Sequence, residues 1–207
     1  ATTDILCAQG WQVIMVDRDG EELALQAAQR SNVTTASYDI SDPKQVEAMV
    51  AQALATHGQI DALVNNAGVA DFGPIEDTTF ARWRRVMETN LDGVFLCTQA
   101  AMPALKKSQG AVVNIASISG LRASTLRVAY GTSKAAVIHL TQQQAAELGE
   151  FGVRVNSVAP GPVRTKLAIA VHTQDIIDAY HDAIPLNRYG REAEIGQVIA
   201  FLCSEQA

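Results

Sequence analysis

Short segments rich in branched apolar residues alternate along the chain with longer segments of helical periodicity, and this alternation is the strongest constraint on the fold. Near-continuous apolar runs such as Val13–Val16 and Ala62–Val64 are typical of strands buried on both faces of a parallel sheet. Strand, helix and strand in repetition favour right-handed crossovers and a doubly wound, Rossmann-like α/β fold. The strands are expected at 12–17, 33–39, 60–65, 111–117 and 153–158.

One of the segments between the strands carries clear signals for both ends of a helix. Asp42 can cap it, and Pro43 suits the first helical position. Gln45, three residues after the cap, predicts a capping box, and Gly58 predicts the end of the helix. With this segment included, helices are expected near 20–30, 43–57, 78–106, 128–149 and 191–204.

The charge balance disfavours several classes of partner. The 207 residues include 16 Lys and Arg and 22 Asp and Glu, so the formal net charge is −6. Because no stretch of five or six like charges is present, neither a nucleic acid nor an anionic membrane is expected as a partner. The apolar runs are far shorter than the ~20 residues of a membrane-spanning helix.

Cysteine and histidine usage favours a reduced compartment and predicts no metal site. Cys7, Cys97 and Cys203 are odd in number and far apart, so they fit neither a disulfide framework nor a zinc spacing. The four histidines show no ligand spacing either. We therefore expect a cytoplasmic globular protein without a bound metal.

Tyr130 and Lys134 are spaced to share one face of a predicted helix, with their Cβ atoms about 6 Å apart. A phenol has a pKa near 10, so it exchanges protons poorly at neutral pH unless a nearby cation stabilises its phenolate. A lysine one turn away supplies that cation. The same spacing is also typical of an ordinary solvated helix face.

Three strand ends carry polar or small residues at the edge where open α/β sheets bind ligands. Ser117 closes the apolar run Ala111–Ala116, and the segment Ile118–Thr125 leads from it to the helix that carries Tyr130. Asn65–Gly68 follows another strand and allows close approach of the backbone to a ligand. Asp17 ends the first predicted strand, where a carboxylate can accept hydrogen bonds from both hydroxyls of an adenosine ribose. Ordinary turn chemistry explains each of these features singly.

Together these segments resemble the short-chain dehydrogenase/reductase family over nearly the whole chain. Any one of them is weak, but six in the order of the family are specific. The matching pieces are Asp17, Asp39-Ile40, Asn65–Gly68, Asn90 within Asn-Leu-Asp-Gly, Ser117 with Tyr130 and Lys134, and Pro160–Thr165.

The resemblance implies four catalytic positions. Tyr130 would be the general acid/base that exchanges a proton with the substrate oxygen. Lys134 would lower the pKa of the tyrosine and hold the nicotinamide ribose. Ser117 would orient the alcohol or carbonyl and stabilise developing charge. Asn90 would position a water that links Lys134 to solvent.

The resemblance also implies the positions that bind the cofactor. Asp17 would bind the adenosine ribose, and Asp39 and Ile40 would flank the adenine. The segment Pro160–Thr165 would pass the nicotinamide, with Val163 and Thr165 contacting its carboxamide. The full set of implied cofactor-binding residues is Asp17, Asp39, Ile40, Asn66, Ala67, Gly68, Tyr130, Lys134, Pro160, Gly161, Val163 and Thr165.

The chain departs from the family at both ends. None of its 14 glycines forms a G-x-G, so the glycine-rich turn between the first strand and first helix is not found. We expect that turn with its strand, and the last strand of the family, to lie outside these 207 residues. Because the first strand is central in the family, its loss would open the middle of the sheet. Residues 1–207 are expected to form a single catalytic domain in which 166–188 is the substrate lid.

The lid carries apolar residues at helical spacing, among them Ile176, Ile177 and Tyr180. A lid closes over bound substrate and excludes water, although a partner subunit could equally cover such a face. Four polar residues are candidates to reach a polar ligand: Asp71, Arg122, Arg127 and His172. Arg82, Arg84 and Arg85 are better explained by helix pairing or solvation.

Asp17 favours NAD over NADP because its carboxylate repels a 2′-phosphate, an effect that Arg18 partly offsets. The expected activity is hydride transfer between NAD and a secondary alcohol or ketone, on a small polyol, sugar or hydroxylated metabolite, by a homotetramer. A 3-oxoacyl-thioester reductase is the alternative, but it would favour NADP and a basic rim. A non-catalytic dinucleotide-binding scaffold is the alternative of another class.

Overall fold

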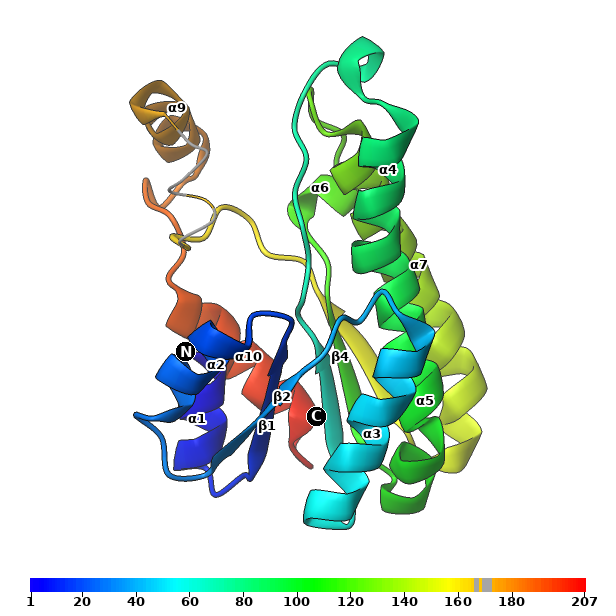
Figure 1. Ribbon diagram of the computed structural model, residues 1–207. Helices are drawn as coiled ribbons and strands as arrows, with labels where there is room; N and C mark the ends of the chain where they lie inside the picture. Colours follow the sequence, from blue (N-terminus) through cyan, green and yellow to red (C-terminus); the bar gives the residue numbers. More distant parts are fainter. Residues whose placement is uncertain (166–167, 169–172) are drawn as a thin grey trace.

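Parallel strands form two sheets in the computed structural model, which describes residues 1–165, 168 and 173–207 (Figure 1). In one sheet β1 (Val13–Asp17) pairs with β2 (Val33–Ser37). In the other, β4 (Ala111–Ile115) lies between β3 (Ala62–Asn65) and β5 (Arg154–Val158). Each predicted strand is confirmed with slightly shorter bounds, and the Rossmann-like α/β architecture is confirmed with them.

The two sheets are separated between β1 and β3. Within the described residues, β1 pairs only with β2, and β3 pairs only with β4. A hollow of about 1700 Å³ lies between them and is lined along its walls by Val13–Val16 and Ala62–Asn65. The opening expected in the middle of the sheet is therefore present, and it reaches the carboxyl ends of both strands.

Helix α3 (Pro43–His57) begins and ends where its end signals predict. The carboxylate of Asp42 accepts hydrogen bonds from the backbone N–H groups of Lys44 and Gln45, and Gly58 ends the helix in the left-handed conformation at φ 77°. The predicted capping box is wrong, because the Gln45 side chain accepts from the N–H of Asp39 and donates to the Asp42 carboxylate. Gln45 thus ties the end of β2 to the start of α3.

The single helix expected over 78–106 is instead several elements. A 3-10 turn, η1 (Ile75–Asp77), precedes α4 (Phe80–Met87). A π-helical turn, η2 (Glu88–Asp92), then joins α4 to α5 (Gly93–Ser108). The widened turn places the side chain of Asn90 in the interior, where it is fully buried. A polar side chain with interior partners thus lies within the π-turn, and such turns frequently occur at functional sites.

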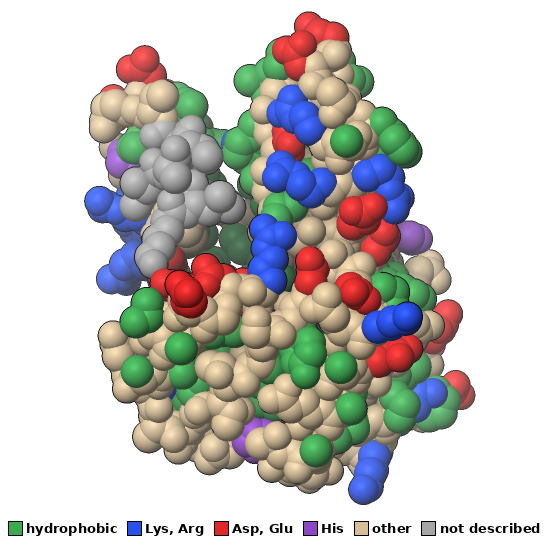
Figure 2. Space-filling view, viewed as in Figure 1, with side chains coloured by type: hydrophobic (Ala, Val, Ile, Leu, Met, Phe, Trp, Pro, Cys, Tyr) green, Lys and Arg blue, Asp and Glu red, His purple; other side chains and the backbone are tan. Residues whose placement is uncertain are grey.

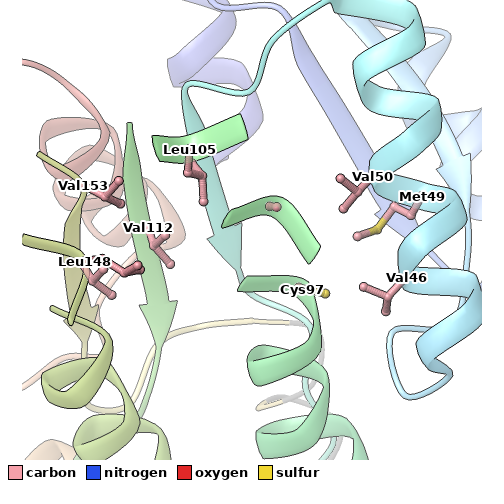
Figure 3. Packing of buried hydrophobic residues seen from close by; sticks show 10 residues of the cluster. Val46, Met49, Val50, Cys97, Leu105, Val112, Leu148 and Val153 are labelled. Atoms are coloured by element: carbon pink, nitrogen blue, oxygen red, sulfur yellow. The ribbon is translucent and has the colours of Figure 1, made fainter. Parts of the chain in front are cut away.

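Alternate residues of β4 face two different apolar clusters. Val112 packs with residues of α3 and α5 and with Val153, as Figure 3 shows. Val113 faces the opposite side, where it packs with Leu6 and Ile199. Both valines are fully buried. This period of two explains why the strand reads as a continuous apolar run.

Several of the remaining helices pack against the strands or against one another. α10 packs against α1 and β4 on one side, while α7 packs against β5 and α6 against α7 (Figure 1). In the part of the chain that the structure describes, no helix has the length and apolar content needed to cross a bilayer. Their bounds are α1 Thr2–Ala8, α2 Gly20–Ala27, α6 Ile118–Leu121, α7 Val128–Leu148, η3 Gly149–Phe151, α9 Gln174–Ala183 and α10 Glu192–Cys203.

Candidate active site

The predicted site residues come from distant parts of the chain and line one hollow. Figure 2 shows the surface hollowed between the part that carries α9 and the part that carries α4. Asn90 does not line the hollow and lies behind its wall. The predicted residues that line it are Asp17, Asp39, Ile40, Asn66, Ala67, Gly68, Ser117, Tyr130, Lys134, Pro160, Gly161, Val163 and Thr165.

Tyr130 and Lys134 lie on consecutive turns of α7, as their spacing predicts. The ammonium Nζ of Lys134 lies 5.9 Å from the centroid of the Tyr130 ring. Lys134 is 5% exposed, and Nζ donates a hydrogen bond of 2.7 Å to the backbone carbonyl of Ile115. Burial lowers the pKa of Lys134 from 10.5 to about 8. The cation is thus held at the tyrosine by the end of strand β4.

Ser117 is buried two residues beyond β4 and caps the short helix α6. Its Oγ accepts a hydrogen bond of 3.2 Å from the backbone N–H of Ser119. An Oγ that accepts this bond still has its own proton to donate to another oxygen. Part of the segment Ile118–Thr125, which leads from Ser117 to α7, is therefore helical. This short helix, α6, packs against α7.

Asn90 fixes the loop that follows β3. Its Oδ1 accepts from the N–H of Val69 over 2.8 Å, and its Nδ2 donates to the carbonyl of Val69 over 2.9 Å. Nδ2 also donates to Oγ of Ser133. A Cβ atom at Gly68 would lie 3.2 Å from Oδ1 of Asn90 and 3.5 Å from Nζ of Lys134. Gly68 therefore allows the loop to pass close to both polar groups.

The acidic strand-end residues lie where the sequence predicts. Asp17 ends β1 and is exposed, and its Oδ1 accepts from the N–H of Asp19 over 3.0 Å. Asp39 follows β2, and Ser41 donates to its Oδ1 through both its hydroxyl and its backbone N–H. These hydrogen bonds from Ser41 lower the pKa of Asp39. The Asp39 carboxylate is thus charged at neutral pH.

The segment after β5 is held to neighbouring elements by its backbone. The carbonyl of Pro160 accepts from the N–H of Ile118, which connects this segment to α6. Val163 forms an isolated parallel bridge with Gly190. Thr165 accepts from the N–H of Ala168 through its hydroxyl. Of the expected lid, α9 is described, whereas Lys166, Leu167 and 169–172 lie outside the described residues.

The polar residues proposed to reach a ligand have different environments. The carboxylate of Asp71 is only 6% exposed and pairs with Arg82 and Arg85, so it is already engaged within the protein. Arg127 lines the hollow, whereas Arg122 is exposed outside its lining. His172 lies outside the described residues. Among the described residues, no three His, Cys, Asp or Glu side chains are grouped to hold a metal ion.

Several residues that shape the site were not predicted. The ring of Phe72 meets that of Tyr130 edge-on, with the centroids 5.9 Å apart. Ser133 donates to the carbonyl of Tyr130 over 2.7 Å and accepts from Asn90. A serine next to Lys134 on the same helix was the available signal for Ser133, while nothing local to Phe72 indicates its partner.

A buried polar network supports the strand ends. Nδ2 of Asn65 donates to Oδ1 of Asn114 over 2.8 Å, across the β3–β4 pair. Asn114 in turn donates to Thr141 and Gln144 on α7. An asparagine inside the apolar run of β4 was the signal for this network, because a buried amide requires partners. It fixes α7 relative to the sheet.

Comparison with known proteins agrees with this arrangement. The family model described as "Enoyl-(Acyl carrier protein) reductase" matches residues 1–207. Meso-2,3-butanediol dehydrogenase of Serratia marcescens is 36% identical over 97% of this chain and 80% of its own length. Trans-4-hydroxycyclohexanecarboxylate dehydrogenase of Sinomonas cyclohexanicum is 35% identical over 98% of this chain and 80% of its own length.

Solved structures match over nearly the whole chain. The crystal structure of levodione reductase superposes with a TM-score of 0.93 at 33% identity, covering 100% of this chain and 86% of that one. ElxO with NADP bound gives a TM-score of 0.91 at 27% identity over 99% of this chain and 86% of its own.

Proposed function

Because the chain belongs to the short-chain dehydrogenase/reductase family of oxidoreductases, we propose that it transfers a hydride between NAD and a secondary alcohol or ketone, with Tyr130 as general acid/base. The observation that carries the proposal is the placement of the Lys134 ammonium 5.9 Å from the Tyr130 ring, in the hollow that the strand-end residues line. An arrangement built only for solvation would not bury a lysine beside a phenol.

Tyr130 accepts the hydroxyl proton of the substrate during oxidation and returns it during reduction. The Lys134 ammonium stabilises the phenolate, which makes the proton exchange feasible near neutral pH. The Ser117 hydroxyl donates a hydrogen bond to the substrate oxygen and stabilises its developing charge. We further propose that Asn90 positions a water between Lys134 and solvent, while its side chain holds Val69 and Ser133.

The residues in the hollow fit a nicotinamide dinucleotide. Exposed Asn66–Gly68 at the end of β3 allow close approach of the backbone, and the hollow is long enough to reach from Asp17 to Tyr130. Asp39 and Ile40 would hold the adenine end of the cofactor, and Pro160, Gly161, Val163 and Thr165 would hold its nicotinamide end. When bound, the cofactor supplies the hydride chemistry.

The proposed preference for NAD rests on Asp17. Its carboxylate is exposed at the end of β1, and its Oδ1 accepts from the N–H of Asp19. A 2′-phosphate at this point would meet a negative charge, whereas ribose hydroxyls would donate to it. Arg18 offsets part of the repulsion. The NADP bound in ElxO makes this preference the first property to measure.

The proposed substrate is a small polyol, sugar or other hydroxylated metabolite. Relatives named for butanediol and hydroxycyclohexanecarboxylate support a compact substrate with a secondary hydroxyl. The segment 166–188 is the proposed lid, and the surface is hollowed between the part that carries its helix α9 and the part that carries α4 (Figure 2). The proposed enzyme is a cytoplasmic homotetramer.

An acyl-thioester reductase is a second candidate, favoured by the acyl carrier protein in the description of the family model. The net charge of −6 opposes it, because an acidic carrier requires a basic rim.

The test measures turnover of a panel of polyols, sugars, hydroxy acids and 3-oxoacyl thioesters with NAD(H) and with NADP(H). The change in absorbance of the reduced cofactor gives the rate. Tyr130→Phe should lower kcat by ~10²–10⁴-fold with cofactor affinity largely kept. Tyr38→Phe is the matched control, since its hydroxyl bonds to Gln52 on α3. Unchanged turnover in Tyr130→Phe would remove Tyr130 from the mechanism, and dinucleotide binding without any turnover would favour the scaffold.

A further inference from the structure

Arg127 places a guanidinium in the substrate end of the hollow. It immediately precedes α7, three residues before Tyr130, and lines the same hollow. Its guanidinium carbon lies 4.7 Å from the centroid of the Phe72 ring. That ring also meets Tyr130, with centroids 5.9 Å apart. Phe72 thus contacts both groups, and one small molecule can reach from the Tyr130 hydroxyl to the guanidinium.

The partners of this guanidinium are neutral. Nη2 donates to the hydroxyl of Tyr180 on α9 over 3.0 Å, and Nη1 donates to Oγ of Ser119 over 3.5 Å. No carboxylate in the described part of the chain lies within 4.0 Å of it. Asp71 precedes Phe72 in the same loop, but its carboxylate is already engaged by Arg82 and Arg85.

A half-buried guanidinium against the Phe72 ring loses hydration that neutral partners replace only in part. Its planar fork of donors matches the two oxygens of a carboxylate better than it matches a hydroxyl. The rings of Phe72 and Tyr130 leave an apolar wall beside it, which suits a hydrocarbon skeleton between the two polar ends of a ligand. An anion with an apolar middle is the ligand that satisfies all of these groups.

We propose that Arg127 is a specificity-determining residue that binds a carboxylate of the substrate, so that the preferred substrates are hydroxy acids and the corresponding keto acids. The proposal rests on the proposed function for the position of the reacting carbon at Tyr130. It narrows the class of hydroxylated metabolites to those with an anionic end. Tyr180 and Ser119 orient the guanidinium for this contact.

The test uses ligands that differ only in charge. Binding of cyclohexanecarboxylate and of cyclohexanecarboxamide to the protein with bound cofactor is measured by calorimetry, which requires no turnover. In parallel, kcat/KM is measured for 4-hydroxycyclohexanecarboxylate and its carboxamide. Arg127→Gln should weaken carboxylate binding roughly 10- to 100-fold relative to the carboxamide, the range for a hydrogen-bonded charge pair. The ratio of the two kcat/KM values should fall by the same factor, mainly through KM.

Two matched variants separate recognition from fixation of the lid. Arg122→Gln removes the same charge from an exposed position outside the hollow, and should leave the carboxylate preference unchanged. Tyr180→Phe removes the hydroxyl that contacts Arg127 but keeps the guanidinium, so it should retain most of the preference. If Tyr180→Phe loses as much preference as Arg127→Gln, Arg127 fixes α9 and the proposal is overturned.

The proposal is also overturned if the wild-type protein binds the two ligands equally or binds neither. It is likewise overturned if Arg127→Gln weakens the binding of both ligands by the same factor. Thermal midpoints of all variants show whether they are folded, and Arg127→Lys, which keeps the charge, should keep part of the preference. Failure of the proposed function gives a different result. In that case no alcohol of the panel is oxidised, while the calorimetric preference for the carboxylate remains.

Discussion

The Nζ atom of Lys134 donates a hydrogen bond to the backbone carbonyl of Ile115 over 2.7 Å. This bond joins α7 to the last residue of β4, the central strand of its sheet. The position of the ammonium is therefore set by the sheet and not by the helix alone. Since Nζ also lies 5.9 Å from the Tyr130 ring, the same bond fixes the cation relative to the phenol.

Lys134→Met should show the cost of this buried charge as a pH-dependent difference in stability. Burial lowers the pKa of Lys134 to about 8 in the folded protein, below the ordinary 10.5. Between these two pH values the unfolded chain binds more protons, so wild-type stability gains as pH rises. The variant lacks this gain. As pH rises, the difference in unfolding free energy between the two proteins should therefore shift by up to about 3 kcal/mol in favour of wild type.

Urea denaturation from pH 7 to 10 measures this difference, and subtraction of the two proteins cancels the titration of the thiols. Lys107→Met removes an exposed lysine from α5 and should show a difference that does not vary with pH. A constant difference for Lys134→Met over the same range would show that its pKa is not lowered.

Much of the fold was predictable because local signals and burial agree. Val112 and Val113 face different apolar clusters, so these two neighbouring positions of β4 are both apolar. Asp42 and Gly58 are local end signals that require no tertiary partner, and α3 has the predicted bounds. The break at Glu88–Asp92 depends instead on partners of Asn90 that are distant in sequence, so periodicity alone predicts one continuous helix there.

Local patterns indicate the candidate residues that the structure places along one hollow, but not the residues that support them. Strand ends and the Tyr130–Lys134 spacing are local, and the sheet necessarily gathers them at one edge. Phe72 and Asp71 are different, because their partners lie on other elements and no spacing relates them. Asp71 could be interpreted only as a polar residue, whereas its pairing with Arg82 appears only in three dimensions.

Asp17→Ala should narrow the preference for NAD over NADP. Removal of the carboxylate eliminates its repulsion of a 2′-phosphate and its hydrogen bonds to the ribose, and leaves Arg18 to attract the phosphate. A change of about 10-fold or more in the ratio of the two kcat/KM values corresponds to the loss of one nearby like charge. Asp77→Ala, in η1, is the control. Equal kinetics of wild type with both cofactors would contradict the role of Asp17.

Gly120→Ala should disturb the packing of α6 on α7. A Cβ atom there would lie 2.6 Å from the carbonyl carbon of Lys134 and 2.7 Å from the backbone nitrogen of Ala135. Because both are backbone atoms, α6 must move, and Ser117 at its start moves with it. We expect a loss of about 1–3 kcal/mol in unfolding free energy and a lower kcat. In Gly149→Ala the added Cβ meets nothing within 4 Å, so that variant should retain stability and activity. Equal behaviour of the two variants would rule out the close approach.

Asp71→Asn should destabilise the loop that holds Phe72 against Tyr130. The carboxylate accepts from Nε of Arg82 over 3.0 Å and from Nη2 of Arg85 over 3.0 Å. The hydrogen bond from Arg82 lowers the pKa of Asp71 below 3.8. The stabilisation is therefore complete above that value and is lost as pH falls through the lower pKa of the folded state.

We expect Asp71→Asn to lose about 1–3 kcal/mol of unfolding free energy at pH 7, as for one partner of a hydrogen-bonded charge pair. The deficit should shrink below pH 4, since wild type then loses the same interaction. Denaturation at pH 3 to 7 measures this. Arg85→Gln should cost less unfolding free energy, because Arg82 keeps its bonds to the carboxylate.

Since Phe72 follows Asp71 and contacts both Tyr130 and Arg127, KM should rise in Asp71→Asn with the loss of stability. A variant as stable as wild type at neutral pH would show that the pair does not hold this loop.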